Sequence, residues 1–463
     1  MTRTLVGSRA ATARREPPRV SRWSSIPELP WAGSALAFTR RPITFLERAH
    51  AECASDIVRF GYFGKTLYSV RGREATELFF DSVNLDLKGG FVEIFGGLLP
   101  KRFLGEEDDD LYAFSKKRSV FNFGAYLDAV HVSTDEVLRE LGKSGEIDLF
   151  ELSSQLSFRA ASRFMLGETI ASPGFFARWR ELFFATNPVE SLGRFQWNLV
   201  NPLFWRKQNE LFAELEALLA RLIDAKDPVP PGEERSFLEL ALNTVYARKS
   251  REQAVAHVYM MFLAAYLNPT LTLGWTLVDL LRRDRENPHR FSVQDELRRA
   301  HARHPDGPLP RAALDELSIL QLCVMETLRL RIRAVNVRKI VNEPFVFRGC
   351  EIPVGALVCN SPTFAHLDPE SYDAPLEHRP ERWLGTPELE RATMTARYMP
   401  FGTFAHICPG KKLSHVWLKV AISELFRRFD VEIAGSIPNV REGIMPVLAD
   451  RDGPCIARYR RRA

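Results

Sequence analysis

The chain has 463 residues, of which 45% are hydrophobic and 26% charged, as is ordinary for a globular protein. A formal net charge of +5 is small for this length and argues against a dedicated nucleic-acid binder, a class that is usually far more basic. The 6 cysteines form no CxxC pair, so neither a disulfide framework nor a cysteine zinc site is indicated, and a reducing, intracellular setting is expected. No apolar run approaches the roughly eighteen residues of a membrane span, and we expect no transmembrane anchor.

The N-terminal segment, residues 1–31, is rich in arginine and proline and is predicted to be an irregular basic tail. Residues 1–15 contain arginine, serine and threonine but no acid, a composition shared by organelle transit peptides. We prefer the simpler interpretation, a tail on a cytoplasmic protein, with import into an organelle as the alternative. Residues 32–463 are predicted to form one domain that carries the active site.

Strand and helix signals follow each other along the rest of the chain. Residues 56–71 contain two β-prone runs joined at Gly64 and Lys65, which predicts a hairpin, and residues 73–80 are predicted to be helical. Helical periodicity dominates from there to about residue 335. Short β-like pieces return over residues 345–360, and a last helix is predicted over residues 411–428. With 32 phenylalanines, the interior is expected to contain aromatic-lined space. We therefore predict a mainly α single domain with a small β lobe near the N-terminus.

The most informative stretch is residues 398–410, with the sequence YMPFGTFAHICPG. Cys408 stands where a glycine-containing loop meets the start of a helix, and backbone N–H groups and the helix dipole there favour a thiolate over a thiol. Pro409 is suited to a first helical position, and Gly410 lets a flat cofactor approach the backbone closely. A lone cysteine taken by itself is more often a buried structural thiol.

The segment resembles the cysteine loop of cytochromes P450. The residues that carry the resemblance fall at the family's spacings: Phe401, Gly402, His406, Cys408 and Gly410. Phe404 is a departure, because the family usually has glycine there. The resemblance implies the single-domain cytochrome P450 fold, with haem b (heme b, iron protoporphyrin IX) as cofactor and Cys408 as the thiolate ligand of its iron. It also implies a monooxygenase that inserts one oxygen atom of O2 into a hydrophobic, sterol-, lipid- or terpenoid-like substrate. The electrons would come from a separate ferredoxin or flavoprotein.

A second family feature is the Glu-x-x-Arg pair of Glu326 and Arg329, with Arg382 further along the chain. Residues three apart share a helix face and can pair, although such a pair alone is usually a solvated surface pair. In the resembled family the three residues form a buried ionic cluster that holds the cysteine loop. The resemblance also implies cations that meet the haem propionates. The candidates are Arg338, His406 and, more loosely matched, Lys116, for which a solvated helix face is an equal alternative.

Residues 252–283 are predicted to be one long helix, and Pro269 should remove one backbone hydrogen bond and kink it. In the resembled family this helix crosses the haem on the side opposite the cysteine. The small pair that leaves room for substrate matches Ala264 and Ala265, and these two residues with Phe262 are the candidates for facing the substrate.

The same alignment places Leu267 and Asn268 where the family usually has an acid and a threonine that relay protons. Asn268 and Thr270 are the candidates for ordering water on the distal face, and an asparagine that satisfies carbonyls freed by Pro269 is an equal alternative. Asparagine at this place is similar to the branch of the family that contains cholesterol 7-alpha-hydroxylase and prostacyclin synthase. Residues 275–281 are similar to sterol 14-demethylases.

Two other functions stay open on these residues. The first is a reductant-independent rearrangement or dehydration of a peroxide, suggested by the missing acid and threonine. The second is a haem-based binding or sensor protein. Lys411, Lys412 and Lys419 around the predicted last helix are either a docking patch for an acidic electron donor or ordinary surface lysines.

Overall fold

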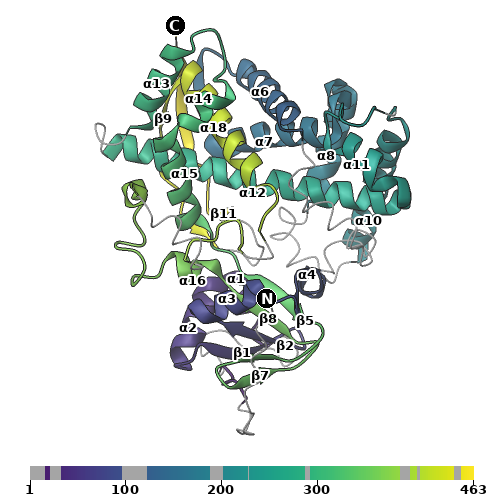
Figure 1. Ribbon diagram of the computed structural model, residues 1–463, viewed down its shortest axis with the longest axis vertical. Coiled ribbons are helices and arrows are strands. Elements are labelled where there is room, and N and C mark those ends of the chain that lie inside the picture. Colours follow the sequence, from purple (N-terminus) through teal and green to yellow (C-terminus); the bar gives the residue numbers. More distant parts are fainter. Residues whose placement is uncertain are drawn as a thin grey trace, which may run out of the picture.

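The structure is a computed structural model that describes residues 16–20, 33–95, 122–187, 202–227, 229–286, 292–385, 397–403, 407–442 and 450–462. Figure 1 shows a mostly helical body and, below it, a smaller lobe of strands and short helices. The predicted mainly α fold with a small β lobe is confirmed.

The β lobe is built on a five-stranded sheet with the strand order β1-β2-β8-β5-β3. Its strands are β1 (Ile57–Tyr62), β2 (Lys65–Val70), β3 (Leu85–Asp86), β5 (Asn336–Ile340) and β8 (Leu357–Asn360). β2 and β8 run parallel, and the other neighbours run antiparallel. The sheet thus joins an N-terminal hairpin to strands from the last third of the chain.

The predicted hairpin over residues 56–71 is confirmed as β1 and β2, which close with Tyr62 opposite Lys65. Phe63 and Gly64 between the strands have φ of 46° and 77°. A two-residue turn whose twist matches the strands requires positive φ at both positions, which glycine adopts without strain. The turn chemistry therefore sets the register of this hairpin.

Short helices and a second hairpin complete the lobe (Figure 1). They are α1 (Ala35–Arg40), α2 (Pro42–Glu52), α3 (Arg73–Asp81), α4 (Leu87–Phe95), α16 (Pro362–His366), β6 (Phe345–Phe347) and β7 (Cys350–Ile352). α4 lies close to β5, because a Cβ atom at Gly90 would be 2.2 Å from the Val337 carbonyl oxygen.

Part of the segment predicted to be an irregular tail belongs to this lobe. The Arg59 backbone in β1 accepts a hydrogen bond from the Val20 N–H and donates one to the Pro18 carbonyl, both at 3.0 Å. Val20 is buried in the lobe's core. Residues 16–20 are therefore held by a long-range backbone pairing that their composition does not reveal.

The helical body carries the longer helices and two small sheets. Its helices are α6 (Phe123–Glu140), α7 (Leu149–Leu166), η2 (Glu168–Ala171), α8 (Pro173–Thr186), α10 (Pro202–Asp224), α11 (Phe237–Thr244), η3 (Tyr246–Arg248), α12 (Arg251–Glu286), α13 (Val293–Arg303), α14 (Arg311–Glu316), α15 (Ser318–Arg331), η4 (Pro380–Trp383) and α18 (Lys411–Arg428). Its strands are β4 (Ser144–Asp148), β9 (Phe429–Ile433), β10 (Val440–Arg441), β11 (Asp450–Arg451) and β12 (Ile456–Arg461). The sheet β4-β12-β9 corrects the expectation that strands gather near the N-terminus.

α12 runs through the middle of the helical body (Figure 1) and is continuous through Pro269. It is apolar on most sides, as in helices surrounded by other helices. An added Cβ at Gly274 would lie 2.4 Å from the ring of Phe150 on α7, so the two helices approach closely here. By length and composition alone, residues 251–283 could cross a membrane, but 56% of their most apolar window is buried inside the protein.

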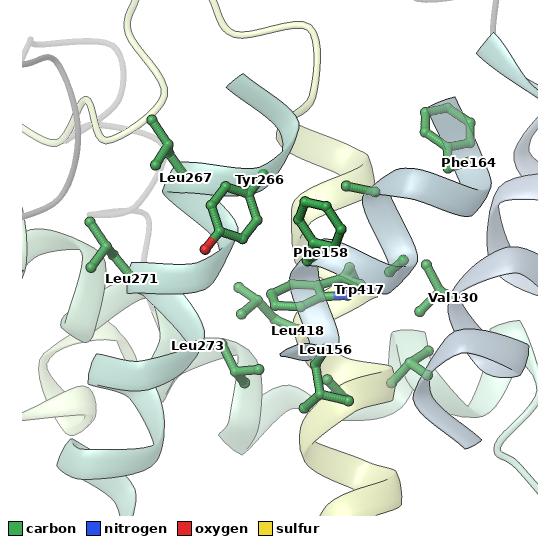
Figure 2. Close-up of a cluster of buried hydrophobic side chains, with 14 of the residues drawn as sticks. Val130, Leu156, Phe158, Phe164, Tyr266, Leu267, Leu271, Leu273, Trp417 and Leu418 are labelled. Carbon is green, nitrogen blue, oxygen red and sulfur yellow. The ribbon is translucent and has the colours of Figure 1, made fainter. Parts of the chain in front are cut away.

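The expected aromatic interior is present where α12 faces α7 and α8. The Phe262 ring lies 4.8 Å from both Trp179 and Phe183, and Tyr266 lies 5.7 Å from Phe158, centroid to centroid. Figure 2 shows Phe158 and Tyr266 facing each other between the helices. Complete burial of one phenylalanine ring contributes about 1.5–3 kcal/mol, so this cluster fixes the face that α12 turns to the core.

Candidate active site

Cys408 lies at the junction of loop and helix that the sequence predicts. α18 begins at Lys411, with Gly410 as its N-cap residue. The backbone N–H groups of Gly410 and Lys411, next to Cys408 in the chain, act to lower the pKa of its thiol, because they carry the positive end of the helix dipole. A Cβ atom at position 410 would lie 3.7 Å from this sulfur. Glycine therefore places no side-chain atom beside the sulfur at this position, which suits a flat cofactor on that atom.

Two opposing effects set the ionisation of Cys408. Burial raises the pKa of the thiol, and the two backbone N–H groups and the charge of Lys411 lower it, as the sequence predicts, without overcoming burial. The thiolate is the form in which this cysteine would bind iron. A bound metal cation deprotonates a coordinating thiol outright, so the thiolate form of Cys408 depends on the metal.

The start of the cysteine loop is held by backbone hydrogen bonds. The Cys408 N–H donates to the Phe401 carbonyl at 2.7 Å, and the Gly402 N–H donates to the Met399 carbonyl at 3.1 Å. Gly402 has a φ of 70°, a left-handed conformation that glycine adopts without strain. The half-buried Phe401 ring packs 5.2 Å from the imidazole of His415 on α18. These contacts connect the two ends of the loop.

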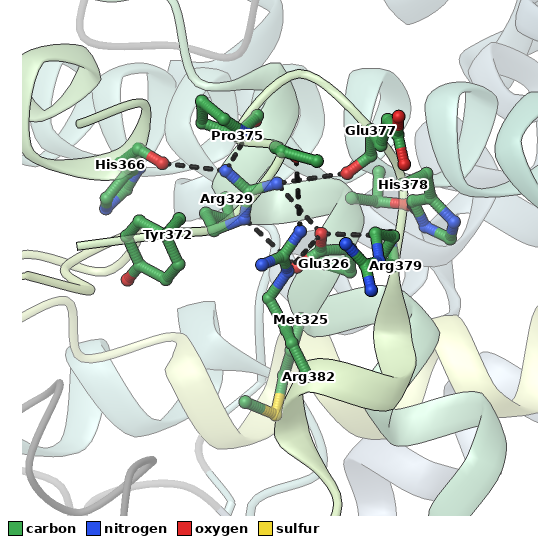
Figure 3. A network of polar contacts seen from close by, with 12 residues as sticks. Met325, Glu326, Arg329, His366, Tyr372, Pro375, Glu377, His378, Arg379 and Arg382 are labelled. Atoms are coloured by element: carbon green, nitrogen blue, oxygen red, sulfur yellow. Dashed lines mark hydrogen bonds and ion pairs between the residues drawn. The ribbon is translucent and has the colours of Figure 1, made fainter. Parts of the chain in front are cut away.

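The structure brings Glu326, Arg329 and Arg382 together, as Figure 3 shows. Arg329 donates to both oxygens of Glu326 at 2.8 and 3.0 Å, and Arg382 Nε donates to Oε1 at 2.9 Å. The indole of Trp383 adds a bond of 2.9 Å to Oε2. Glu326 and Arg329 are fully buried. Burial would raise the pKa of Glu326, but the hydrogen bonds and charges of the two arginines hold it below its ordinary value. The surface-pair alternative is thereby excluded.

This cluster is connected to the cysteine loop through α15 and α16. The Tyr398 hydroxyl donates to the Met325 carbonyl at 3.1 Å. His366 accepts two hydrogen bonds. The Met399 N–H donates to its ring Nε2 at 2.9 Å, and Arg329 Nη1 donates to its backbone carbonyl at 2.7 Å. Burial lowers the pKa of His366 to about 3, so its ring stays neutral and can accept. Residues 398 and 399, which begin the loop, are therefore held by the helix that carries Glu326.

One face of α12 is open where the rest of the helix is packed. Ala264 is exposed, and Met261, Ala265 and Asn268 are half-buried, in a helix whose other central residues are mostly buried. These residues recur at intervals of three and four and so share one face. The open face carries Ala264, Ala265 and Asn268 of the sequence-based set, whose predicted roles remain predictions.

Thr270 and Phe262 do not lie on this face. Successive residues turn about 100° around a helix, which puts Thr270 on nearly the opposite side from Asn268. Thr270 is buried, and its hydroxyl donates to the Tyr266 carbonyl at 2.7 Å. Phe262 is fully buried in the aromatic cluster. The structure therefore separates both residues from Asn268. Thr272 lies closer to that face, and its hydroxyl donates to the Asn268 carbonyl at 2.7 Å.

Arg338 lies on β5 and is 1% exposed. Its Nη1 donates to the Phe79 carbonyl at 2.6 Å, and the guanidinium lies over the rings of Phe79 and Phe80 at 4.5 and 4.9 Å. A buried guanidinium is suited to a buried carboxylate. This position is compatible with the expected propionate contact, which stays a prediction.

The remaining predicted basic residues fall into three groups: outside the described residues, exposed, and buried. Lys116 and His406 fall within residues 96–121 and 404–406, outside the described residues. Lys411 and Lys412 are exposed. Lys419 is 6% exposed and donates to the Leu314 carbonyl at 2.9 Å, and burial lowers its pKa. Lys419 is therefore a core residue and not part of a docking patch.

A second buried polar cluster, centred on Asp279 of α12, was not predicted from the sequence. Asp279 is fully buried and pairs with Arg331 of α15. Thr327 of α15 donates to Asp279 at 3.1 Å and also contacts His378 Nε2 at 3.2 Å. The sequence contained one signal of this cluster, the acidic residue inside the apolar run of α12. A buried charge requires a partner, so such a residue predicts a basic or hydrogen-bonding side chain beside it.

Comparison with known proteins identifies a family and several relatives of this chain. The family model described as Cytochrome P450 matches residues 114–450. Lanosterol 14-alpha demethylase of Mus musculus is 26% identical over 464 residues, covering 94% of this chain and 86% of the relative. Sterol 14alpha-demethylase of Mycobacterium tuberculosis is 25% identical over 447 residues, covering 92% and 95%. A solved structure, retinoic acid bound cyanobacterial CYP120A1, matches with a TM-score of 0.75 and 19% identity over 97% of this chain and 100% of that chain.

Proposed function

This chain belongs to the cytochrome P450 family, and from that premise we propose that it inserts one oxygen atom of O2 into a hydrophobic, sterol-, lipid- or terpenoid-like substrate. The family and the relatives establish a haem b monooxygenase-type oxidoreductase related to the sterol 14-demethylase branch. The proposal adds the substrate class, the electron donor and the roles of single residues. The observation that carries it is the place of Cys408 at the N-terminus of α18, with Gly410 beside its sulfur.

We assign the iron ligand to Cys408. A thiolate ligand lets bound haem favour O–O cleavage, which is the chemistry that the cofactor supplies. The chain's own contribution is to fix the sulfur. The backbone N–H groups of Gly410 and Lys411 favour its thiolate, and the loop before it is held through His366 and Tyr398 to the Glu326 cluster. Arg338, His406 and Lys116 are the proposed cations for the propionates.

The proposed substrate class rests on the open face of α12 and on the relatives. Ala264 and Ala265 leave space beside Asn268, and Met261 adds a flexible apolar side chain. The sterol demethylases among the relatives are named for sterols, and the matched structure carries retinoic acid. Both are elongated, largely apolar molecules. We propose the same class of ligand here and place Asn268 at the water-ordering position.

The electron donor is proposed to be a separate ferredoxin or flavoprotein in the cytoplasm. The exposed Lys411 and Lys412, next to Cys408 in sequence, are available to an acidic partner. With Lys419 buried, this docking proposal is limited to those two lysines.

The first test asks whether Cys408 is the ligand. Cys408→Ala should abolish the thiolate-type absorbance of the ferrous–carbonyl complex, because no other sulfur occupies this helix N-terminus. Cys53→Ser is the matched control, since Cys53 is a half-buried thiol at the end of α2, and it should leave the spectrum unchanged. A thiolate-type spectrum in Cys408→Ala would refute the assignment.

A rearrangement or dehydration of a peroxide is the second candidate function, favoured by Leu267 and Asn268 at the places of the usual acid and threonine. A panel of lipophilic compounds and lipid hydroperoxides separates the two, with and without reductant and surrogate donors. Electron-dependent turnover with labelled oxygen from O2 in the product would support the monooxygenase. Turnover of a hydroperoxide without reductant would replace it with the rearrangement.

A further inference from the structure

Asp279, Thr327, Arg331 and His378 form a buried polar cluster separate from that of Glu326, which we call the Asp279 clamp. Asp279 lies on α12, Thr327 and Arg331 lie on α15, and His378 precedes η4. Asp279 and Thr327 are fully buried, and Arg331 and His378 are 8% exposed. Polar side chains in the core need partners, and here Asp279, Thr327, Arg331 and His378 Nε2 find them in one another and in the Cys323 carbonyl.

The hydrogen bonds of the clamp have one direction. The Cys323 carbonyl, 3.3 Å from His378 Nε2, can only accept, so Nε2 carries the proton and donates. Thr327 accepts from the same Nε2 at 3.2 Å and donates to Asp279 Oδ2 at 3.1 Å. Arg331 Nε donates to that oxygen at 3.2 Å, and its Nη2 pairs with Oδ1.

Electrostatics keep the clamp ionised. Burial would raise the pKa of Asp279, but the charge of Arg331 reverses the effect and holds the pKa below its ordinary value. The Arg331 guanidinium also lies over the ring of Trp275, 4.2 Å from its centroid and one turn before Asp279. The clamp therefore holds α12 to α15 by a charge pair and by packing at adjacent turns.

The clamp lies on the side of α12 that carries the open face. Asp279 follows Asn268 by eleven residues, which is three turns, about 16 Å along the axis and nearly the same angle around it. Pro269 has no N–H for the Ala265 carbonyl, so the helix is weakest just before Asn268. Thr272 donates to the Asn268 carbonyl at 2.7 Å and ties this residue to the following turn. Asn268 is thus linked to the clamped half of α12.

We propose that Asp279 and Thr327 are positioning residues, which set the height and rotation of the open face of α12 and so the place of Asn268 above the haem. The proposal rests on the proposed function for the identity of that face. α15 is the common support, because Glu326 on it holds the cysteine loop while the neighbouring Thr327 holds α12. One helix thereby fixes the distance between the two sides of the cofactor site.

The test uses imidazole, which binds haem iron on the side opposite the thiolate, and follows absorbance in the purified holoenzyme. Thr327→Val removes the hydroxyl at nearly constant volume and should raise the imidazole Kd about three- to tenfold. Thr327→Ser keeps the hydroxyl and should restore the wild-type Kd. Asp279→Asn should have a larger effect, and if it fails to fold, the Thr327 pair still decides.

Thr276→Val is the matched control. Thr276 is fully buried on α12, the helix of Asp279. Its hydroxyl donates to the Thr272 carbonyl within α12 at 2.7 Å, so this bond makes no link to α15. Its imidazole Kd should stay within about twofold of wild type, whatever the change in melting temperature. An unchanged Kd in Thr327→Val, with a lowered melting temperature, would overturn the proposal and leave the clamp a purely stabilising contact. Imidazole binding needs no substrate, oxygen or electrons, so a failure of the proposed turnover would be seen separately.

Discussion

At the scale of single residues, the carboxylate of Glu326 joins three parts of the chain. It accepts from Arg329 on its own helix, from the backbone N–H of Arg379 at 3.0 Å and from Arg382 and Trp383 in η4. The bonds to Arg329 and Trp383 are buried, and those to Arg379 and Arg382 are partly buried, while the carboxylate itself is fully buried, where an unpaired charge is costly. The charge of one side chain therefore positions the segment that leads to the cysteine loop.

Glu326→Gln should be strongly destabilising, because the amide leaves the buried Arg329 and Arg382 without a counter-charge. We expect a loss of about 3–5 kcal/mol in the free energy of unfolding, measured with denaturant. Glu140→Gln is the control: Glu140 is an exposed partner of Arg159 at 3.3 Å, and its loss should cost less than about 1 kcal/mol. Equal effects in the two variants would contradict a special role for the buried cluster.

At the scale of elements, the contact of α12 with α7 determines which face of α12 remains open. The Phe150 ring lies against Gly274 and 5.2 Å from the Trp275 ring. The aromatic cluster around Phe262 covers the same helix two to three turns earlier. With these sides packed, the face of Ala264 and Asn268 is left for a ligand.

Gly274→Ala should disturb this packing, because its Cβ would lie 2.4 Å from the Phe150 ring. Overpacking of a core contact costs about 1–3 kcal/mol, and the melting temperature should fall accordingly. The control is Gly174→Ala in α8, where a Cβ meets nothing within 4 Å and the change should be neutral or stabilising. If both variants melted like wild type, α12 and α7 would be less tightly packed than described.

At the scale of the whole molecule, the buried His50 and His366 and the half-buried His415 make stability depend on pH. Burial lowers the pKa of His50 to about 4, of His366 to about 3 and of His415 to about 4. Between these values and an ordinary histidine pKa, the unfolded chain binds protons that the folded chain does not. Stability is therefore fully present above about pH 6.5 and declines as the pH falls toward 4.

Urea unfolding at pH 7.5, 6 and 5 should show this decline, with an uptake of about one proton for each of the three imidazoles. His366→Gln keeps an acceptor for the Met399 N–H but cannot titrate. Because the substitution also changes the packing around residue 366, the measured quantity is the slope of the free energy of unfolding with pH, which should fall by the equivalent of about one proton. An unchanged slope would show that His366 does not contribute.

The local sequence determined much of this protein by itself. The hairpin of β1 and β2, the long α12 and the junction of loop and helix before α18 could be predicted from the sequence. In each case the signal lies in neighbouring residues, because turn chemistry and helical periodicity are local. The family resemblance added the cofactor and the meeting of Glu326, Arg329 and Arg382.

Only the tertiary structure decided which way the side chains of α12 point and which charges are buried. In a helix that is apolar on most sides, the pattern of polar residues does not show which face is open. Phe262 and Thr270 were therefore expected near Asn268, although they lie on other sides of the helix. Lys419 and Asp279 differ from surface charges only through partners that are distant in sequence. Lys419 donates to the Leu314 carbonyl on α14, and Asp279 pairs with Arg331 on α15. The pKa of Cys408 likewise depends on burial, which outweighs the local N–H groups. These properties arise from contacts between residues distant in sequence, and desolvation in the folded core sets their magnitude.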